Sequence, residues 1–357
     1  MGKLIEERKA RWTDFYDLSQ KPSQMFLIRV PETVPEQVVP MPDRKMERIE
    51  WAWNQYRRQR EKAAWLDDDA IPYLHVHTGT EIFAAAFGSP VHQVGKDMPC
   101  ALPFITDASQ VSKIKVPDLD TPCLRIIFEI ADELKKRAGP DAILRMVDVQ
   151  SPMGIASSMW AKDSFFLAIT DQPEAVKELA AKVNQLIVTF LEEWFQRYGA
   201  GFVAHYPDYY MPKGITLSED EIGCVGPEVF HDLFRPELAK LSQHFGGIGL
   251  HCCANARHQW AGLKSIPGLK LLNLNQSEEV LREAYSFFGA NVPQMHIPCV
   301  GTYPLTWKDH LDGRVVLEVP VESKEQAIDL AAQIRKKVSV SQDFQLPTSC
   351  EREKNCK

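Results

Sequence analysis

The stretch DQPEAVKELAAKVNQLIVTFLEEWFQRYGAGFVAHY (171–206) predicts a long amphipathic helix followed directly by a short strand. Asp171 is the expected N-cap, Pro173 suits the first helical turn, and Gly199 is the expected stop. The residues FVAHY (202–206) are then apolar and of strand length. One broad helical face carries Val176, Leu179, Ala180, Val183, Leu186, Ile187, Phe190, Leu191 and Trp194. The pattern is typical of one helix-strand unit of an α/β fold.

The same alternation extends in both directions along the chain. A second amphipathic helix is expected between Gly226-Pro227 and Gly246-Gly247. Other strand-like runs are YLHVH (73–77), ILRMVDV (143–149), GIGLH (247–251), KLLNL (270–274), QMHI (294–297) and RVVLEV (314–319). Strands that alternate with helices indicate a parallel sheet with helices packed against it. We therefore predict one α/β barrel over residues 66–340, a helical N-terminal extension over 1–65 and a disordered tail over 341–357.

The composition of the chain indicates which classes of partner are not expected to bind it and in which compartment the protein is expected. The 357 residues include 41 Lys and Arg against 48 Asp and Glu, which gives a net charge of −7 and argues against nucleic acid as a partner. No run approaches the roughly eighteen apolar residues of a membrane span, so no membrane partner is expected. The eight cysteines lack the spacing of a disulfide framework, and the first residues are charged. These features predict a cytoplasmic protein with reduced thiols. Homodimer formation is left open.

The segment GLHCCAN (249–255) carries the most informative chemistry. Its apolar run ends in His251, so the histidine and the cysteines after it should lie at the C-terminal end of a strand, where barrel enzymes keep their active sites. In an extended chain His251 and Cys253 face the same side, and Cys252 faces away. A His/Cys pair suits zinc. The alternative is a buried histidine beside small apolar thiols.

A catalytic zinc usually has three protein ligands, so a third is sought elsewhere in the sequence. Cys299, after the run QMHI, is the best thiolate candidate, and Glu318, near the end of RVVLEV, is the best carboxylate candidate. The alternatives are an ordinary core thiol for Cys299 and a loop carboxylate for Glu318.

Three further residues are candidates for catalysis. Asp220 and Glu221, in SEDE (218–221), follow a strand-like run and could act as general acid or base, although helix capping or a solvated loop would also explain them. His205, in the run FVAHY, completes the candidate catalytic set. No GxxxxGK[ST], GxGxxG after a strand, or GxSxG occurs, which disfavours nucleotide-dependent kinases, Rossmann dehydrogenases and α/β-hydrolases.

Taken in order, several segments resemble the uroporphyrinogen decarboxylase superfamily over roughly residues 70–335. The segments are PYLHVHTGTEIFAAAFG (72–88), VPDLD (116–120), DVQSPMGIASSMW (148–160), DQPEAVKEL (171–179), LSEDEIGCVGPEVFHDLFRPELAKL (217–241) and GLHCCANARHQWAGLKSIPGLKLLNL (249–274). The resemblance implies a (β/α)8 TIM barrel. It also implies one of two activities, decarboxylation of uroporphyrinogen without a cofactor or methyl transfer to or from a corrinoid with the help of zinc.

The residues of this chain favour the methyltransferase branch. Decarboxylases of the superfamily carry several arginines in an N-terminal loop, whereas QMFLIRVPETVPEQ (24–37) has Arg29 alone. His251-x-Cys253 matches the first half of the zinc motif of the methyltransferases. The second half departs from the pattern, because Cys299 comes earlier than expected and no cysteine lies between Val300 and Ser349.

The resemblance therefore implies zinc and a corrinoid, supplied by a partner corrinoid protein or as free cobalamin. The second substrate would be a small-molecule methyl donor or acceptor, in an O-demethylase or a thiol methyltransferase. Two alternatives remain at this point, a lyase similar to uroporphyrinogen decarboxylase and a non-catalytic protein that binds a corrinoid or tetrapyrrole.

Overall fold

A computed structural model describes residues 2–32, 35–300, 307–310 and 312–338. Twelve helices and twelve strands are assigned within these ranges. The helices are α1 (Gly2–Tyr16), α2 (Lys45–Ala63), α3 (Ile82–Ala86), α4 (Pro122–Ala138), α5 (Pro152–Met159), α6 (Lys162–Asp171), α7 (Pro173–Tyr198), α8 (Pro227–Val229), α9 (Arg235–Phe245), α10 (Trp260–Lys264), α11 (Glu278–Phe288) and α12 (Lys324–Val338). The strands are β1 (Gln24–Arg29), β2 (Tyr73–Leu74), β3 (Val91–His92), β4 (Cys100–Ala101), β5 (Ile143–Leu144), β6 (Phe202–Val203), β7 (Tyr210–Met211), β8 (Ile215–Ser218), β9 (Ile248–Cys252), β10 (Leu269–Ser277), β11 (Ile297–Val300) and β12 (Val315–Pro320).

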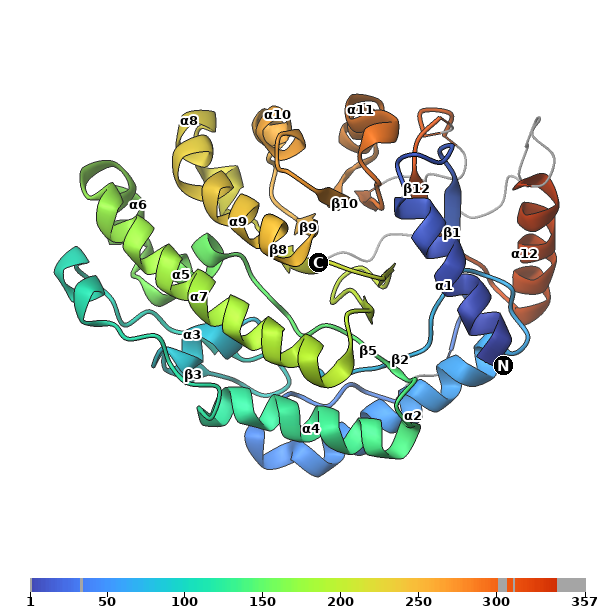
Figure 1. Cartoon of the computed structure of the whole chain (residues 1–357), viewed down its shortest axis with the longest axis horizontal. Helices are drawn as coiled ribbons and strands as arrows, with labels where there is room; N and C mark the ends of the chain where they lie inside the picture. Colours follow the sequence, from blue (N-terminus) through green and yellow to red (C-terminus); the bar gives the residue numbers. More distant parts are fainter. Residues whose placement is uncertain (1, 33–34, 301–306, 311, 339–357) are drawn as a thin grey trace.

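Parallel strands form the wall of the barrel. Strands β8, β9 and β10 pair side by side, and β10 also pairs with β11. Single bridges through Gln294 connect β10 to β12, which pairs along its whole length with β1. In the other direction the bridge Gln150–Ser218 connects β8 to the chain after β5, and β5 pairs with β2. The strands thus form the parallel barrel that the sequence predicts, with helices outside it (Figure 1).

The wall is closed between β1 and the chain before β2 by two buried carboxylates. Asp69 Oδ2 accepts the backbone N–H of Phe26 at 2.9 Å, and Asp68 Oδ2 accepts that of Ile28 at 3.1 Å. Asp69 also accepts from Arg11 of α1 at 2.7 Å and lies 2.5 Å from Arg335 of α12. Backbone donors of a strand must find an acceptor when they are buried. The Asp68-Asp69 pair therefore replaces a strand partner and attaches two helices to the same point.

The helices cover the barrel through the faces that their sequences predict. All nine apolar residues expected on the long helix are buried in α7. One detail of the prediction is wrong: Asp171 is the last residue of α6, and Gln172 holds the N-cap position of α7 without a side-chain cap. Two helices meet here, because Pro173 begins the second one, and a proline cannot continue the hydrogen bonding of the first.

The first 65 residues contribute a strand as well as helices. Helices α1 and α2 lie in this range, as the expected N-terminal extension requires. Between them, however, β1 pairs in parallel with β12, so that Leu27 lies opposite Glu318. The expectation of a purely helical extension thus omitted one strand of the barrel wall. The expected tail, 341–357, lies outside the described residues.

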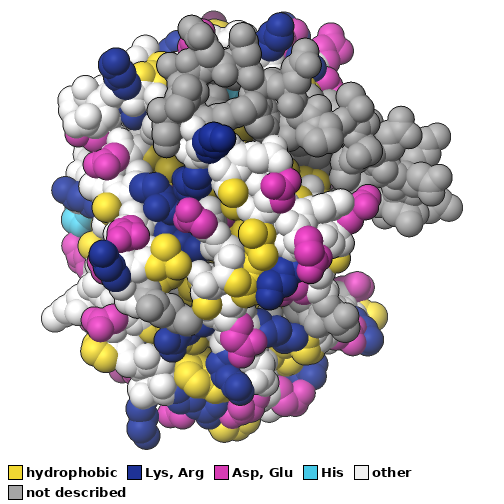
Figure 2. Space-filling view, turned by 90° about the vertical axis from the view of Figure 1, so that its right-hand side faces the viewer, with side chains coloured by type: hydrophobic (Ala, Val, Ile, Leu, Met, Phe, Trp, Pro, Cys, Tyr) yellow, Lys and Arg dark blue, Asp and Glu magenta, His cyan; other side chains and the backbone are white. Residues whose placement is uncertain are grey.

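The surface carries both signs of charge. On the face shown in Figure 2, Lys and Arg side chains are interspersed with Asp and Glu side chains. Within the described ranges, no helix has the length and apolar character needed to cross a membrane.

We expect Asp69→Ala to destabilise the protein by about 3 kcal/mol, because it removes the acceptor of a buried N–H and the nearest carboxylate of two arginines. The matched control is Asp67→Ala. Asp67 has a side chain 56% exposed and lies 3.7 Å from Arg11 and 3.5 Å from Arg335. Exposed ion pairs contribute little, so a loss of about 0.5 kcal/mol is expected there. Urea unfolding of both variants measures the difference, and equal losses would contradict the role of Asp69 in closing the barrel.

Candidate functional site

Strands β8, β9 and β10 place three polar side chains in one row, at the C-terminal ends of β8 and β9 and in the middle of β10. Ser218 of β8 is in register with His251 of β9, which is in register with Asn273 of β10. All five residues of β9 are buried, because the strand lies between two others inside the helical layer. The row therefore lies at the edge of the barrel where the sequence placed the candidate site.

Asn273 determines which nitrogen of His251 is free. The amide nitrogen of Asn273 donates to the carbonyl of Met295, which can only accept, so the amide oxygen faces His251 and accepts from Nδ1. The Nδ1 atom then carries the proton, and the lone pair of Nε2 points away from Asn273. Nε2 lies 2.8 Å from the Sγ atom of Cys253. The structure thus brings His251 and Cys253 together, with the basic nitrogen aimed at the sulfur.

Burial keeps this pair uncharged. It lowers the pKa of His251, although the Asn273 hydrogen bond and the charge of Asp220 oppose the effect. Burial also raises the pKa of Cys253, and the negative charge of Asp220 adds to the rise. The pair therefore consists of a neutral imidazole and a thiol. A divalent cation would displace the thiol proton on binding.

Of the two acidic candidates, only Asp220 lies beside the pair. Its Oδ1 atom accepts the backbone N–H of Cys253 at 2.5 Å and that of Ala254 at 3.3 Å, so it holds the turn that follows β9. Glu221 is directed elsewhere, because it forms an ion pair with Lys162 and accepts from the hydroxyl of Ser157 at 2.8 Å. The structure therefore separates two residues that the sequence treated as equivalent.

The third catalytic candidate, His205, faces a carboxylate that the sequence analysis did not select. His205 Nε2 lies 3.2 Å from Asp148 Oδ2. Burial raises the pKa of Asp148, but the hydrogen bond and charge of His205 outweigh it, and the net pKa is lowered. The His205 Nδ1 atom is buried and has no hydrogen-bond partner among the described residues. Both His205 and Asp148 act electrostatically on His251, which places them in the same neighbourhood.

Glu318 and Cys299 do not join His251 and Cys253. Glu318 lies opposite β1 and forms an ion pair with Arg29 at 3.2 Å. Cys299 of β11 is exposed and lies at an irregularity in the pairing of β10 with β11, between the paired residues Pro298 and Val300. No group of three or more His, Cys, Asp and Glu side chains that could hold a metal occurs in the part of the chain that the structure describes. Neither of the two expected third ligands therefore lies beside the pair in the described structure: Glu318 is paired with Arg29, and Cys299 is exposed.

The arginines near Glu318 are neutralised by the chain itself. Arg29 also lies 3.4 Å from Asp208, whose second oxygen lies 2.9 Å from Arg145. Burial alone would lower the pKa of Arg29, but Asp208 and Glu318 outweigh it and raise that pKa. Burial likewise raises the pKa of Asp208, and the two arginines reverse this and lower it. Two positive and two negative side chains therefore balance within this ion-pair cluster.

Asp148, Asp208 and Asn273 were not among the site residues predicted from the sequence. Asp148 lies in the strand-like run ILRMVDV, and Asn273 lies in KLLNL. A search for polar residues near the end of every predicted strand would have found both. Asp208 follows a short turn after β6, and nothing in its local sequence marks it.

Comparisons with known proteins agree with this architecture. The sequence model described as uroporphyrinogen decarboxylase (URO-D) matches residues 29–297. Among solved structures, a methyltransferase from Methanosarcina mazei has a similar fold, with a TM-score of 0.65 over 94% of this chain and 99% of that chain at 11% identity. The predicted TIM barrel is thereby confirmed. No curated protein matches the chain.

The pKa of Asp208 gives a prediction for the pH dependence of stability. A carboxyl whose pKa is lowered in the folded state stabilises the fold above its unfolded pKa, and this contribution is lost as the pH falls. Asp208→Asn should therefore lower the free energy of unfolding by about 2 kcal/mol at pH 7, and the difference from wild type should shrink below about pH 4. The exposed Asp43→Asn is the control, for which we expect a small effect. A difference that grows on acidification would contradict the ion-pair account.

Proposed function

The chain belongs to the uroporphyrinogen decarboxylase family, and we propose that it acts as a methyltransferase of that family. In this proposal His251 and Cys253 bind zinc, and a methyl group moves between a corrinoid and a small-molecule donor or acceptor. The corrinoid comes from a partner corrinoid protein or as free cobalamin. A cytoplasmic location is part of the same proposal, since thiols such as that of Cys253 stay reduced in the cytosol.

One observation carries the proposal, the alignment of Met295, Asn273, His251 and Cys253. A histidine that binds a metal nearly always donates its other ring N–H to a fixed acceptor, which orients the ring and makes the binding nitrogen more basic. Asn273 is such an acceptor, and its own orientation is fixed by Met295. The buried His296 has a similar partner, since its Nε2 lies 2.9 Å from Gln294 Oε1, but its Nδ1 accepts a backbone N–H. The distinguishing feature of His251 is therefore the Cys253 sulfur beside its unprotonated nitrogen.

The residues present fit part of a catalytic zinc site. One imidazole and one thiol 2.8 Å apart are ligands of the kind that zinc prefers. When bound there, zinc would act as a Lewis acid on the heteroatom of the donor or acceptor. The described residues supply these two ligands, and neither Cys299 nor Glu318 is part of the proposed set.

The side chains around His251 and Cys253 have different roles in the proposed mechanism. Asn273 orients the imidazole of His251, and Asp220 holds the backbone of Cys253. Asp148 accepts the Nε2 proton of His205, which leaves a lone pair on the buried Nδ1 atom, without a hydrogen-bond partner among the described residues. His205 can therefore take a proton from a thiol or hydroxyl of the second substrate, or return one, as general base and acid.

The ion-pair cluster favours methyl transfer over decarboxylation of a porphyrinogen. A substrate with many carboxylates needs cations that are free to pair with it. Here Arg29 is bound to Glu318 and Asp208, and Arg145 is bound to Asp208. Binding a polycarboxylate would require breaking these pairs. Decarboxylation and non-catalytic corrinoid binding thus become alternative outcomes of the tests below.

We expect the purified wild-type protein to contain about one equivalent of zinc, measured by plasma mass spectrometry. Cys253→Ser should lose most of it, because the thiolate is replaced by a weaker ligand. Asn273→Ala should bind zinc about 10 to 100 times more weakly in competition with a chelator. Cys299→Ser is the matched control and should keep the wild-type content. A metal-free wild type, or the same loss in Cys299→Ser, would contradict the proposed site.

Activity is tested with methylcobalamin, a panel of thiols and the zinc-loaded protein, followed by the visible spectrum of the corrinoid. The reverse direction uses cob(I)alamin with a panel of methyl ethers. We expect demethylation or methylation of the corrinoid with at least one substrate, and a rate about 100 times lower for His205→Ala. Formation of coproporphyrinogen from uroporphyrinogen, in the absence of methyl transfer, would instead identify a decarboxylase. Corrinoid binding without either reaction would identify a carrier.

A further inference from the structure

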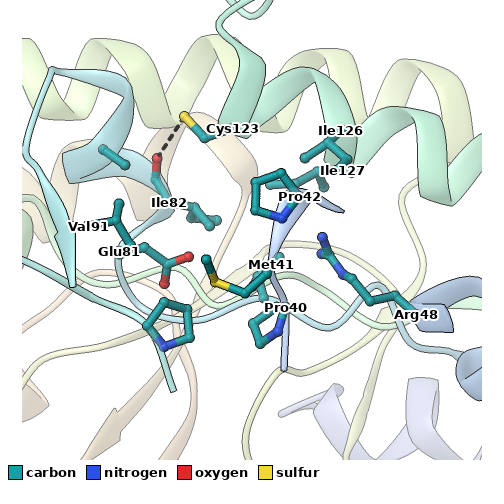
Figure 3. A pocket seen from close by; sticks show the side chains of 13 residues that line it. Pro40, Met41, Pro42, Arg48, Glu81, Ile82, Val91, Cys123, Ile126 and Ile127 are labelled. Carbon is teal, nitrogen blue, oxygen red and sulfur yellow. Dashed lines mark hydrogen bonds between the residues drawn. The ribbon is translucent and has the colours of Figure 1, made fainter. Parts of the chain in front are cut away.

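A cavity of about 160 Å³ lies within the helical layer of the barrel (Figure 3). Its walls come from the segment Pro40–Pro42, helices α2, α3 and α4, and the hairpin of β3 and β4. Pro42 and Val91 at its rim are exposed, whereas most of the remaining lining residues are buried. The cavity is therefore a pocket that a small molecule can enter from the surface.

Two buried charged side chains point into this pocket from opposite sides (Figure 3). Glu81 is 8% exposed and Arg48 is 4% exposed. The Oε2 atom of Glu81 and the Nε atom of Arg48 have no hydrogen-bond partner among the described residues. Native proteins rarely leave buried polar atoms unpaired, because each such atom has lost its water without gaining a partner. These two atoms therefore indicate a ligand that supplies a donor and an acceptor.

Each charged side chain is held in place by the chain around it. Arg48 donates from Nη2 to the backbone carbonyl of His77 at 2.7 Å, which leaves its Nε free to face the pocket. The carboxylate of Glu81 lies over Gly79, where a Cβ atom would come within 2.2 Å of Oε2. Any side chain at position 79 would thus displace the carboxylate from its present place.

The rest of the lining is apolar and sets the size of the ligand. Ile82, Ile126, Ile127 and Met41 are among the apolar side chains that line the pocket around the two charges. An apolar protein cavity of about 150 Å³ accommodates a benzene molecule. The pocket therefore has room for one ring of six atoms with a small substituent.

From these observations we propose that the pocket is a binding site for a neutral, ring-sized molecule that carries a hydroxyl group. A hydroxyl both donates and accepts, so it can satisfy the carboxylate of Glu81 and the Nε–H of Arg48. The ligand is neutral because Glu81 and Arg48 already balance each other, and a further charge would be buried without a counter-charge. This site is independent of the proposed methyltransferase function.

The pocket is connected to the candidate functional site through Thr78. Thr78 lines the pocket, and its hydroxyl oxygen accepts the backbone N–H of Asp148 at 3.0 Å. Asp148 is in turn the partner of His205. Thr78 would therefore separate a molecule in the pocket from the Asp148–His205 pair.

The charge of Glu81 makes binding depend on pH. The groups that face it are Arg48 of α2, Asp148 after β5 and Cys123 of α4. Burial raises the pKa of Glu81 to about 7, Asp148 adds to the rise, and Arg48 opposes it. The ionised carboxylate is the stronger acceptor of a hydroxyl proton. Affinity for a hydroxyl compound is therefore expected to rise as the pH increases through 7.

The experiment compares phenol with toluene, which has the same shape but lacks the hydroxyl, by calorimetric titration of the full chain. We expect saturable binding of phenol that is at least about tenfold tighter than that of toluene. Glu81→Leu should remove this preference, and the exposed Glu36→Leu is the matched control that should retain it. Weak, equal binding of both probes to wild type, or an unchanged preference in Glu81→Leu, would overturn the proposal.

A second variant tests the same pocket in case Glu81→Leu does not fold. Ala85, half-buried in the pocket wall one helical turn after Glu81, is replaced by Phe to fill the space without changing either charged residue. Ala85→Phe should abolish binding of both probes while the protein still unfolds cooperatively. Unchanged phenol binding in a folded Ala85→Phe would place the ligand elsewhere and overturn the proposal.

Discussion

The parallel register of β9 between β8 and β10 is the constraint on which the candidate site depends. It aligns Ser218, His251 and Asn273 across three strands. A slip of one residue would turn His251 to the other face of the wall and bring Cys252 to the site instead. Because Asn273 is fixed by Met295, the same register also decides which nitrogen of the imidazole is basic. Strand pairing thus determines which nitrogen of the His251 imidazole carries the proton.

The closing of the barrel and the chemistry of the site rest on different charged groups. Asp69 closes the wall on one side, where it accepts from β1 and from two arginines. Asp208 neutralises the arginines near the site. Asp69 thus serves the stability of the fold. Asp208 affects which substrates can bind, because it leaves the nearby arginines already paired. The site that results holds a neutral imidazole-thiol pair beside a balanced ion-pair cluster, which suits a metal and a small neutral or thiol substrate better than a polycarboxylate.

Much of the fold could be predicted from local sequence, and the site could be predicted only in part. The amphipathic period of α7 and the strand-like runs near β9 and β12 identified their elements, because periodicity is a local property. Strand β1 was missed since its partner, β12, lies some 290 residues away in the chain. The i, i+2 spacing brought His251 and Cys253 together. The place of Glu318 was not predictable, because it is decided by Arg29 across a strand pair that no local pattern reveals.

The central claim is that His251 and Cys253 bind zinc with the nitrogen and sulfur that the structure brings to 2.8 Å. X-ray absorption at the zinc edge of the purified protein tests this claim most directly. The account predicts a sulfur scatterer at about 2.3 Å together with nitrogen or oxygen scatterers at about 2.0 Å, and loss of the sulfur contribution in Cys253→Ser. Zinc with only oxygen and nitrogen neighbours in the wild type would contradict it.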